Sequence, residues 1–346
     1  MSWYNTQGPL WDHVLFSRVR YIRNIAKQSF APSGDLKKSA EAIAKLESIL
    51  GKNGFRAERP APGVTAEMLS LAEKQLIGRD LVYSDKPRAI FLNEPCNLLV
   101  YVGGNNHITV SSVVSGAGVG EARRMAMGAE ELIDRELSFA YADGIGYLSP
   151  YPQDCGSGIE FSAALYLPSL RLSGKAAGGA GIACDPALTL RPMMSGADNA
   201  GDLYILSYVP HYLADEESAC DFFLNTVTAM AEKEKSRLRI LCKDIEKDIY
   251  ETARRSLGAL IYATRLGEGE MLRMISSIRL ALSVSEGGCE DLPDITTLNY
   301  LSAEGLSASV TLSASEKCLT SEDCERARAA LVCRYIEHKN EVKNVK

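Results

Sequence analysis

Three arginines lie close together near the start of the chain, in the segment Ser17-Arg18-Val19-Arg20-Tyr21-Ile22-Arg23-Asn24. If this segment forms a strand, Arg18 and Arg20 point to the same face, because successive side chains alternate. A guanidinium group stays charged and presents a planar fork of donors that fits phosphate oxygens. The cluster suits a phosphate site chemically, but its spacing alone favours a solvated basic stretch without a ligand.

The composition narrows the class of protein. The chain has 346 residues, 46% of them hydrophobic and 24% charged, an ordinary balance for one or two globular domains. Its net charge of -6 gives no basic excess for a nucleic-acid partner. No apolar run reaches membrane-spanning length and the opening residues contain no apolar signal segment, so we expect a cytoplasmic protein that binds no membrane. The nine cysteines are scattered without a CxxC pair, so we expect neither a metal site nor a disulfide framework.

Hydrophobic periodicity indicates a mostly helical start, a β-rich middle and a helical end. Two helices are predicted first, over 35–50 and over 65–77, the second with Thr65 as its N-cap. The middle contains strands over 88–93, 97–102, 107–114, 161–170 and 203–209, with a helix over 121–137. From Asp215 helical patterns dominate, and the last helix is predicted over 321–338 with Ser321 as its N-cap.

The arginine segment resembles the phosphate-binding segment of the ATP:guanido phosphotransferases, in particular the protein arginine kinases. Further matching segments lie at Trp3–Pro9, Glu73–Ile77, Gly146–Gly158, Leu167–Leu170, Arg255–Gly258 and Ser277–Leu280. The resemblance covers nearly the whole chain and implies an α+β protein with the guanido kinase fold. It would have a small helical N-terminal part over 1–80, an antiparallel-sheet catalytic-like domain over 81–232 and a helical C-terminal domain over 233–340.

The same resemblance implies transfer of the γ-phosphoryl group of ATP, with magnesium, to a guanidinium nitrogen. The family orients the guanidinium with carboxylates in an Asn-Glu-Glu-Asp-His stretch, which aligns here with Gly103-Gly104-Asn105-Asn106-His107. Gly104 and Asn105 therefore stand where both glutamates would be. Tyr151 stands at the position of the family's cysteine beside the substrate. We expect none of the catalytic positions to be intact.

The nucleotide-phosphate positions are partly kept. The resemblance assigns phosphate binding to Ser17, Arg18, Arg20 and Arg23, which are all present. Other positions have changed: a pocket histidine aligns with Gln75, and two phosphate-binding arginines align with Thr109 and Glu160. A last arginine falls near Leu190, so the neighbouring Arg191 is a possible substitute.

We therefore expect a divergent, catalytically impaired homologue, a pseudokinase, that acts as a regulator or binding partner in protein quality control linked to phosphoarginine and Clp proteases. One alternative is an active ATP:protein-arginine phosphotransferase with a relocated carboxylate, for which Asp143, Asp154 and Glu160 are candidates. Removing a general base alone costs roughly 10²–10⁴ in rate. Another enzyme activity on the same fold also remains open.

A third alternative is a phosphoarginine-binding module in the helical domain. The family's Arg-Asp-x-x-Arg-Ala segment aligns with Cys324-Glu325-Arg326-Ala327-Arg328-Ala329, which makes Glu325 and Arg328 the candidates. The partners that the resemblance implies are a second copy or an active paralogue, a ClpC-type unfoldase and a phosphoarginine protein. Leu238, Leu241 and Ile245 form an apolar helical stripe that would suit pairing of protomers.

Overall fold

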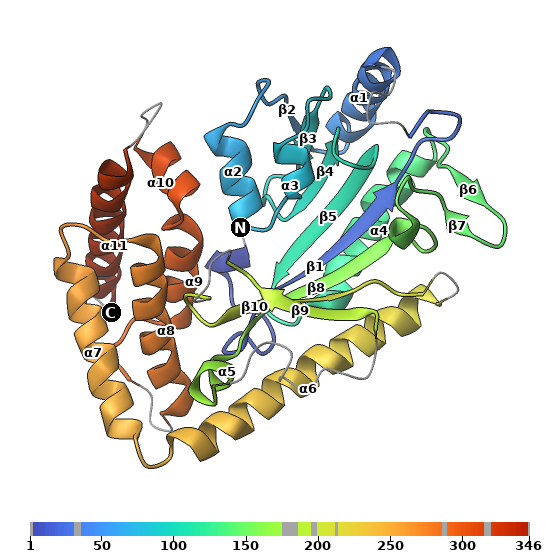
Figure 1. Cartoon of the computed structure of the whole chain (residues 1–346). Helices are drawn as coiled ribbons and strands as arrows, with labels where there is room; N and C mark the ends of the chain where they lie inside the picture. The colour runs from blue at the N-terminus through green and yellow to red at the C-terminus, as the bar shows by residue number, and fades with distance from the viewer. Residues whose placement is uncertain are drawn as a thin grey trace.

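The structure is a computed structural model that describes residues 3–30, 36–174, 186–194, 199–211, 214–285, 289–314 and 320–344. An eight-stranded antiparallel sheet with helices on both faces forms one part of the molecule, and a group of helices forms the other (Figure 1). The expected α+β fold class with an antiparallel sheet is confirmed.

The strand order in the sheet is β2-β3-β4-β5-β1-β8-β10-β9, with β1 near the middle. The strands are β1 (Val14–Arg23), β2 (Arg56–Glu58), β3 (Ala89–Leu92), β4 (Leu98–Val102), β5 (Ile108–Ser115), β8 (Ile159–Tyr166), β9 (Leu188–Pro192) and β10 (Leu203–Tyr208), with a separate hairpin of β6 (Tyr141–Ala142) and β7 (Gly146–Tyr147). In the register, Arg20 of β1 lies opposite Ser111 of β5 on one side and Glu160 of β8 on the other. This pairing places the arginine segment between two strands that come much later in the chain.

The helices among the described residues divide between the two parts of the molecule. Those beside the sheet are α1 (Leu36–Gly51), α2 (Ala66–Glu73), α3 (Arg79–Val82), α4 (Val119–Asp134), α5 (Pro168–Leu172) and α6 (Glu216–Cys242), with short 3₁₀ turns η1 (Trp3–Asn5) and η2 (Pro152–Asp154). The helical part consists of α7 (Glu246–Tyr262), α8 (Glu268–Val284), α9 (Ile295–Glu304), α10 (Ser307–Ser313) and α11 (Ser321–Asn344). None of the described helices is long and apolar enough to cross a membrane.

Two apolar cores cover the two faces of the sheet. On one face Val19 and Tyr21 of β1 pack with residues of α1, α4 and α6. On the other face Phe16 packs with Trp3 of η1 and with Met68 of α2. A third core holds the helical part together. Arg18 and Arg20 belong by alternation to the face that α2 and α3 cover.

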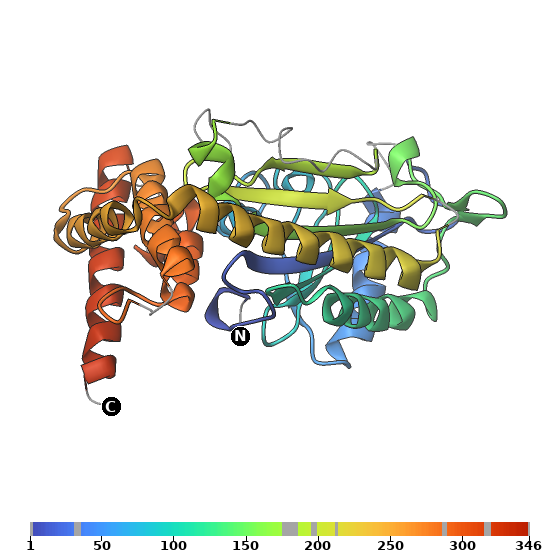
Figure 2. The same ribbon diagram turned by 90° about the horizontal axis from the view of Figure 1, so that it is seen from below.

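The three predicted sequence ranges remain a prediction. β1 comes from the first range, 1–80, yet it lies inside the sheet. α6 passes residue 232 as one unbroken helix of 27 residues that runs beneath the sheet toward the helical part (Figure 2). The end of the sheet domain and the start of the helical part are thus joined by a continuous element.

Most of the predicted elements are present, but the structure differs from the local predictions at several positions. Thr65 caps α2 as predicted, since its hydroxyl accepts from the amide of Met68. The predicted strand over 161–170 ends at Tyr166, because Pro168 begins α5 and a proline fits the first turn of a helix. Thr320, rather than Ser321, caps α11, since its hydroxyl accepts from the amide of Asp323. Strand β9 was not predicted at all.

Candidate functional site

A polar cavity of about 310 Å³ lies on the sheet face that α2 and α3 cover. Strands β1, β8, β9 and β10 form its floor, and the segment from α2 to α3 forms a wall. Its charged and polar lining comes from Arg18, Arg20, Gln75, Arg79, Glu160, Arg191 and Ser207. The structure therefore brings together Arg18, Arg20, Gln75, Glu160 and Arg191, which the resemblance named from four separate segments.

Arg18 is held rigidly at the base of the cavity. Its Nε and Nη2 donate to Ser162 Oγ at 3.2 and 3.0 Å, and its Nη1 donates to the backbone carbonyl of Gln75 at 2.9 Å. Gln75 has a positive φ of 61°, a conformation that places this carbonyl but is uncommon for a residue with a side chain. Burial and the charge of Arg20 lower the pKa of Arg18 to about 9. Arg18 therefore remains a cation at neutral pH.

Glu160 is an anion that belongs to the cavity itself. Its Oε1 lies 3.5 Å from Arg18 Nη2 and its Oε2 lies 3.5 Å from Arg20 Nη1. Ser207 Oγ donates to the same carboxylate at 3.4 Å. Burial alone would raise the pKa of Glu160, but the positive charges of Arg20, Arg18 and Arg191 lower it overall. The carboxylate is thus ionised and occupies part of the space that faces the arginines.

Positive charge still exceeds negative charge in the cavity. Four arginines, Arg18, Arg20, Arg79 and Arg191, line it together with the single carboxylate of Glu160. Burial and the nearby charges of Arg20 and Arg79 lower the pKa of Arg191, although Glu160 opposes this. The Nε of Arg20 is buried and has no hydrogen-bond partner among the described residues. This arrangement can bind an anion in addition to Glu160.

Ser17 and Arg23 lie on the opposite face of the sheet. Ser17 Oγ donates to the carbonyl of Gly116 at 2.8 Å. Arg23 Nε donates to Glu130 Oε1 of α4 at 2.7 Å, and its guanidinium lies over the ring of Tyr147, 3.5 Å from the centroid. The structure does not bring these two residues into the cavity, although the resemblance grouped them with Arg18 and Arg20.

A carboxylate that the sequence did not suggest lies beside the loop at Gly103–His107. Asp80, from the four-residue α3, accepts from the amide of Asn105 at 2.7 Å through its Oδ2. A side chain at position 104 would collide with this carboxylate, so Asp80 fills the space beside Gly104. Burial alone would lower the pKa of Arg20, but Tyr101, Glu160 and Asp80 raise it overall. The only sequence signal was a charged pair, Arg79-Asp80, which follows the matched segment Glu73–Ile77 after one glycine.

The remaining predicted positions around this loop make structural contacts. His107 Nδ1 accepts from the amide of Ile25 at 3.0 Å, and its Nε2 lies 3.1 Å from the carbonyl of Ser29. Thr109 is buried in β5. Tyr151 donates its amide to Ser149 Oγ at 3.1 Å. These contacts hold the loops and leave the arginine cavity as the candidate site.

The two other carboxylates considered as relocated groups lie outside the cavity lining. Asp154 Oδ2 accepts from Asn106 Nδ2 at 3.1 Å. Burial raises the pKa of Asp154, and the charges of Glu160 and Asp80 act in the same direction. Asp143 is exposed in the turn between β6 and β7. Asp154 is therefore electrostatically close to the cavity, whereas Asp143 makes no polar contact toward it among the residues that the structure describes.

Arg328 is buried in the helical part and is fully engaged with protein groups. Its Nε donates to the carbonyl of Gly305 at 2.6 Å, its Nη1 to that of Leu266 at 2.8 Å and its Nη2 to Ser307 Oγ at 2.9 Å. Glu325 pairs with Arg265, whose Nη2 lies 2.8 Å from its Oε2. A phosphoryl group could reach Arg328 only if bonds that join α8, α9, α10 and α11 were broken.

The apolar stripe suggested for protomer pairing is only partly exposed. Leu238 is 1% exposed and belongs to the core of the helical part, whereas Leu241 and Ile245 are each 42% exposed. Two of the three residues are thus available at the surface where α6 meets α7. Pairing of protomers remains a prediction.

Comparison with known protein families identifies one match. A family model described as "ATP:guanido phosphotransferase, C-terminal catalytic domain" matches residues 59–237. Two similar curated proteins are named protein-arginine kinase. The one from Halothermothrix orenii is 25% identical over 288 residues, covering 82% of each chain. The one from Clostridium kluyveri is 24% identical over 338 residues, covering 96% of this chain and 97% of its own.

Comparison with solved structures supports the fold. Lombricine kinase has a TM-score of 0.53 at 18% identity, covering 67% of this chain and 68% of its own. The duplicated taurocyamine kinase from Schistosoma mansoni, with bound transition-state-analogue components, has a TM-score of 0.53 at 21% identity. The match covers 64% of this chain and 33% of that longer one.

Proposed function

Because the chain belongs to the ATP:guanido phosphotransferase family, we propose that it keeps an anion cavity of that family but has lost most of its power to transfer phosphate. The observation that carries this proposal is Glu160, which is ionised and paired with both Arg18 and Arg20. A carboxylate in this position repels the phosphate oxygens that those arginines would otherwise stabilise. The protein would then act by binding, as a regulator of an active kinase or of a ClpC-type unfoldase.

The donors in the cavity fit phosphate better than they fit a metal ion. Arginine forks match phosphate oxygens, and four arginines line the cavity. The carboxylate of Glu160 already pairs with two of these arginines, Arg18 and Arg20. Among the described residues there is no group of three or more side chains that could hold a metal ion. We therefore propose that a phosphate group of the ATP class binds here, and that any magnesium arrives with it.

Mass spectrometry after incubation with ATP, magnesium and an arginine-rich acceptor protein tests this proposal. We expect no phosphoarginine above the background without protein. Phosphoarginine that forms with the native chain and disappears in Arg18→Ala would overturn the proposal. Isothermal titration with ATP, run in parallel on both proteins, reports whether the cavity still binds the nucleotide.

An active phosphotransferase is the second candidate, and Asp80 is the observation that favours it. Its carboxylate lies beside Gly104, at the loop where the resemblance places the family's acceptor carboxylates. A carboxylate there could orient an incoming guanidinium and take its proton. On this candidate the same assay yields phosphoarginine, and Asp80→Asn lowers the rate roughly 10²–10⁴-fold. Equal rates in the two proteins would exclude Asp80 from the reaction.

We do not propose a phosphoarginine-binding module at Glu325 and Arg328. The three nitrogens of Arg328 donate to groups within the protein, and Glu325 is paired with Arg265. Breaking such a buried network leaves polar groups without partners, at a cost of about 1–3 kcal/mol for each group.

A further inference from the structure

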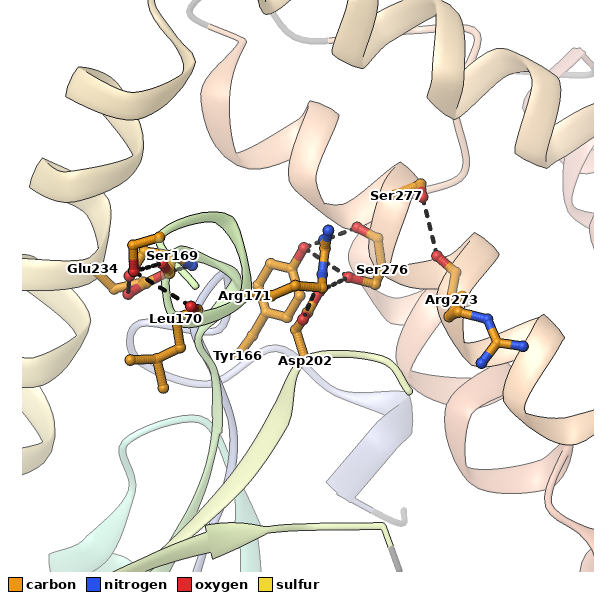
Figure 3. Close-up of polar contacts among 10 residues, drawn as sticks. Tyr166, Ser169, Leu170, Arg171, Asp202, Glu234, Arg273, Ser276 and Ser277 are labelled. Atoms are coloured by element: carbon orange, nitrogen blue, oxygen red, sulfur yellow. Dashed lines mark hydrogen bonds and ion pairs between the residues drawn. The ribbon is translucent and has the colours of Figure 1, made fainter. Parts of the chain in front are cut away.

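Two polar clusters join the sheet part to the helical part, and the first has balanced charges. Figure 3 shows Asp202 between Arg171 and Ser276: Arg171 Nε lies 2.9 Å from Oδ1, and Ser276 Oγ donates to Oδ2 at 2.5 Å. The hydroxyl of Tyr166 donates to the carbonyl of Ser276 at 2.8 Å. The charges of Asp202 and Arg171 thus balance each other.

The second cluster places two carboxylates against the same helix end. Glu73 is the last residue of α2, and its Oε2 accepts from the amide of Ala308 in α10 at 3.1 Å. Glu268, at the start of α8, accepts from the amide and the hydroxyl of Ser307 at 2.9 and 2.6 Å. The two carboxylates come from opposite sides of the contact and bind adjacent residues of α10. Their negative charges therefore oppose each other across the contact.

Of the two cations near this pair, Lys74 has another partner and Arg328 pairs with Glu268 itself. Lys74 Nζ lies 2.8 Å from Glu304 Oε1 of α9, and Arg328 of α11 lies 3.7 Å from Glu268 Oε2. The residues of α10 itself, Ser307–Ser313, carry no ionisable side chain. Burial and the charge of Glu268 raise the pKa of Glu73 to about 7, although the amide of Ala308 and the charges of Lys74 and Arg328 oppose the rise. Glu73 thus changes its charge near neutral pH.

We propose that Glu73 and Glu268 form a proton-sensitive latch between α2 and the helical part. A proton on Glu73 removes the repulsion between the two carboxylates. Because the pKa of Glu73 is higher in the closed contact than in water, the closed contact binds the proton more tightly than the open one. Closure is therefore favoured below about pH 7 and weakened as the pH rises through that value.

The latch is connected to the arginine cavity through the chain itself. α2 ends at Glu73, and the next residues, through Gln75 and Arg79, form the cavity wall. The carbonyl of Gln75 holds Arg18 at 2.9 Å. A movement of α2 against α10 therefore shifts the group that positions Arg18. The contact between the two parts would respond to pH whether or not the cavity binds a phosphate.

Trp3 is a natural reporter for this contact. Its Nε1 donates to the carbonyl of Lys74 at 3.3 Å, and its ring lies 5.3 Å from that of Tyr4, which itself contacts Tyr300 of α9. The other tryptophan of the chain, Trp11, is replaced by phenylalanine so that Trp3 alone fluoresces. The emission of this Trp11→Phe protein is recorded between pH 5.5 and 8.5 without added ligand.

We expect one transition with a midpoint near pH 7. Glu73→Gln, which resembles the protonated form, should abolish the transition and keep the low-pH emission at all pH values. Glu268→Gln should move the midpoint down by about one pH unit, because it removes the like charge. Glu67→Gln, a change to an exposed acid on the same helix, should leave the midpoint unchanged.

Two results would overturn the latch. One is a transition that persists in Glu73→Gln at the same midpoint, which would assign it to another group. The other is an unchanged midpoint in Glu268→Gln. If Glu73→Gln does not fold, the midpoint of the transition in Glu268→Gln is sufficient to test the proposal. Anion binding is measured separately by calorimetry, so failure of the proposed function and failure of the latch give different results.

Discussion

Arg20 and Arg23 lie three residues apart in β1, but their surroundings differ on the two faces of the sheet. Arg23 has a close carboxylate, three backbone carbonyls at 2.9 to 3.2 Å and an aromatic ring beneath it. Arg20 has one carboxylate at 3.5 Å and a buried Nε without a hydrogen-bond partner among the described residues. One guanidinium is satisfied by the fold, whereas the other keeps unused donor capacity beside a cavity.

This difference separates an arginine that stabilises a fold from an arginine that can bind a ligand. A buried ion pair is costly to break because the remaining partner stays desolvated. An arginine whose donors are not all used can form charge-assisted bonds to an incoming anion. We therefore expect changes at the two positions to differ in how much stability they cost.

The largest expected effect is a loss of stability in Arg23→Ala. Glu130, whose side chain is only 10% exposed, would stay buried but would lose its partner. Removing one member of a buried pair costs about 3–5 kcal/mol of the free energy of unfolding, measurable by urea denaturation. Arg20→Ala is the matched change, and we expect a smaller loss because Glu160 keeps Arg18. Equal losses in the two variants would remove the distinction between the faces.

A gain in anion affinity is expected for Glu160→Gln. The change removes the resident negative charge and leaves four arginines in the cavity. We expect the affinity for pyrophosphate to rise about tenfold, which corresponds to about 1.4 kcal/mol, by calorimetry at low salt. Glu131→Gln, an exposed position on α4, is the control and should leave the affinity unchanged. An unchanged affinity in Glu160→Gln would show that the carboxylate does not limit binding.

The smallest expected effect is a change in acid stability. The arginines hold the pKa of Glu160 below its usual value even though burial opposes them. A carboxyl group with a lowered pKa contributes stability at neutral pH and loses it as the pH falls through the folded-state pKa. The free energy of unfolding should therefore fall less steeply below about pH 4.5 in Glu160→Gln than in the native chain. If the free energy of unfolding fell equally with pH in the two proteins, that result would contradict the ion pairs of Glu160.

The sequence contained more information on these faces than the resemblance used. Side-chain alternation predicted that Arg18 and Arg20 share a face, and the strand confirms it. The same rule assigns Arg23 to the other face, because it lies an odd number of residues from Arg18. Alternation also assigns Ser17 to that other face, because it lies one residue from Arg18. The family alignment grouped all four residues as one segment and so obscured this physical difference.

Other parts of the site could not be predicted from local patterns. Asp80 lies in a helix of only four residues, which has no periodicity to recognise. β9 is short, lies at the edge of the sheet and ends in Pro192, so its pairing with β10 depends on contacts far along the chain. Gln75, Glu160 and Arg191 were grouped only by the family resemblance, because no local pattern shows that the fold brings these three residues together. Local patterns thus identify the types of residue in the site, but they do not predict which residues lie next to one another in the folded protein.

The unbroken α6 has a mechanical consequence. A helix of 27 residues is about 40 Å long, at a rise of about 1.5 Å per residue. It lies along the sheet at one end and meets α7 at the other (Figure 2). A rod of this length acts as a lever: a tilt of about 5° at the sheet displaces the far end by about 3 Å. Small movements of α6 beside the strands therefore become larger movements at its far end, near the exposed side chains of Leu241 and Ile245.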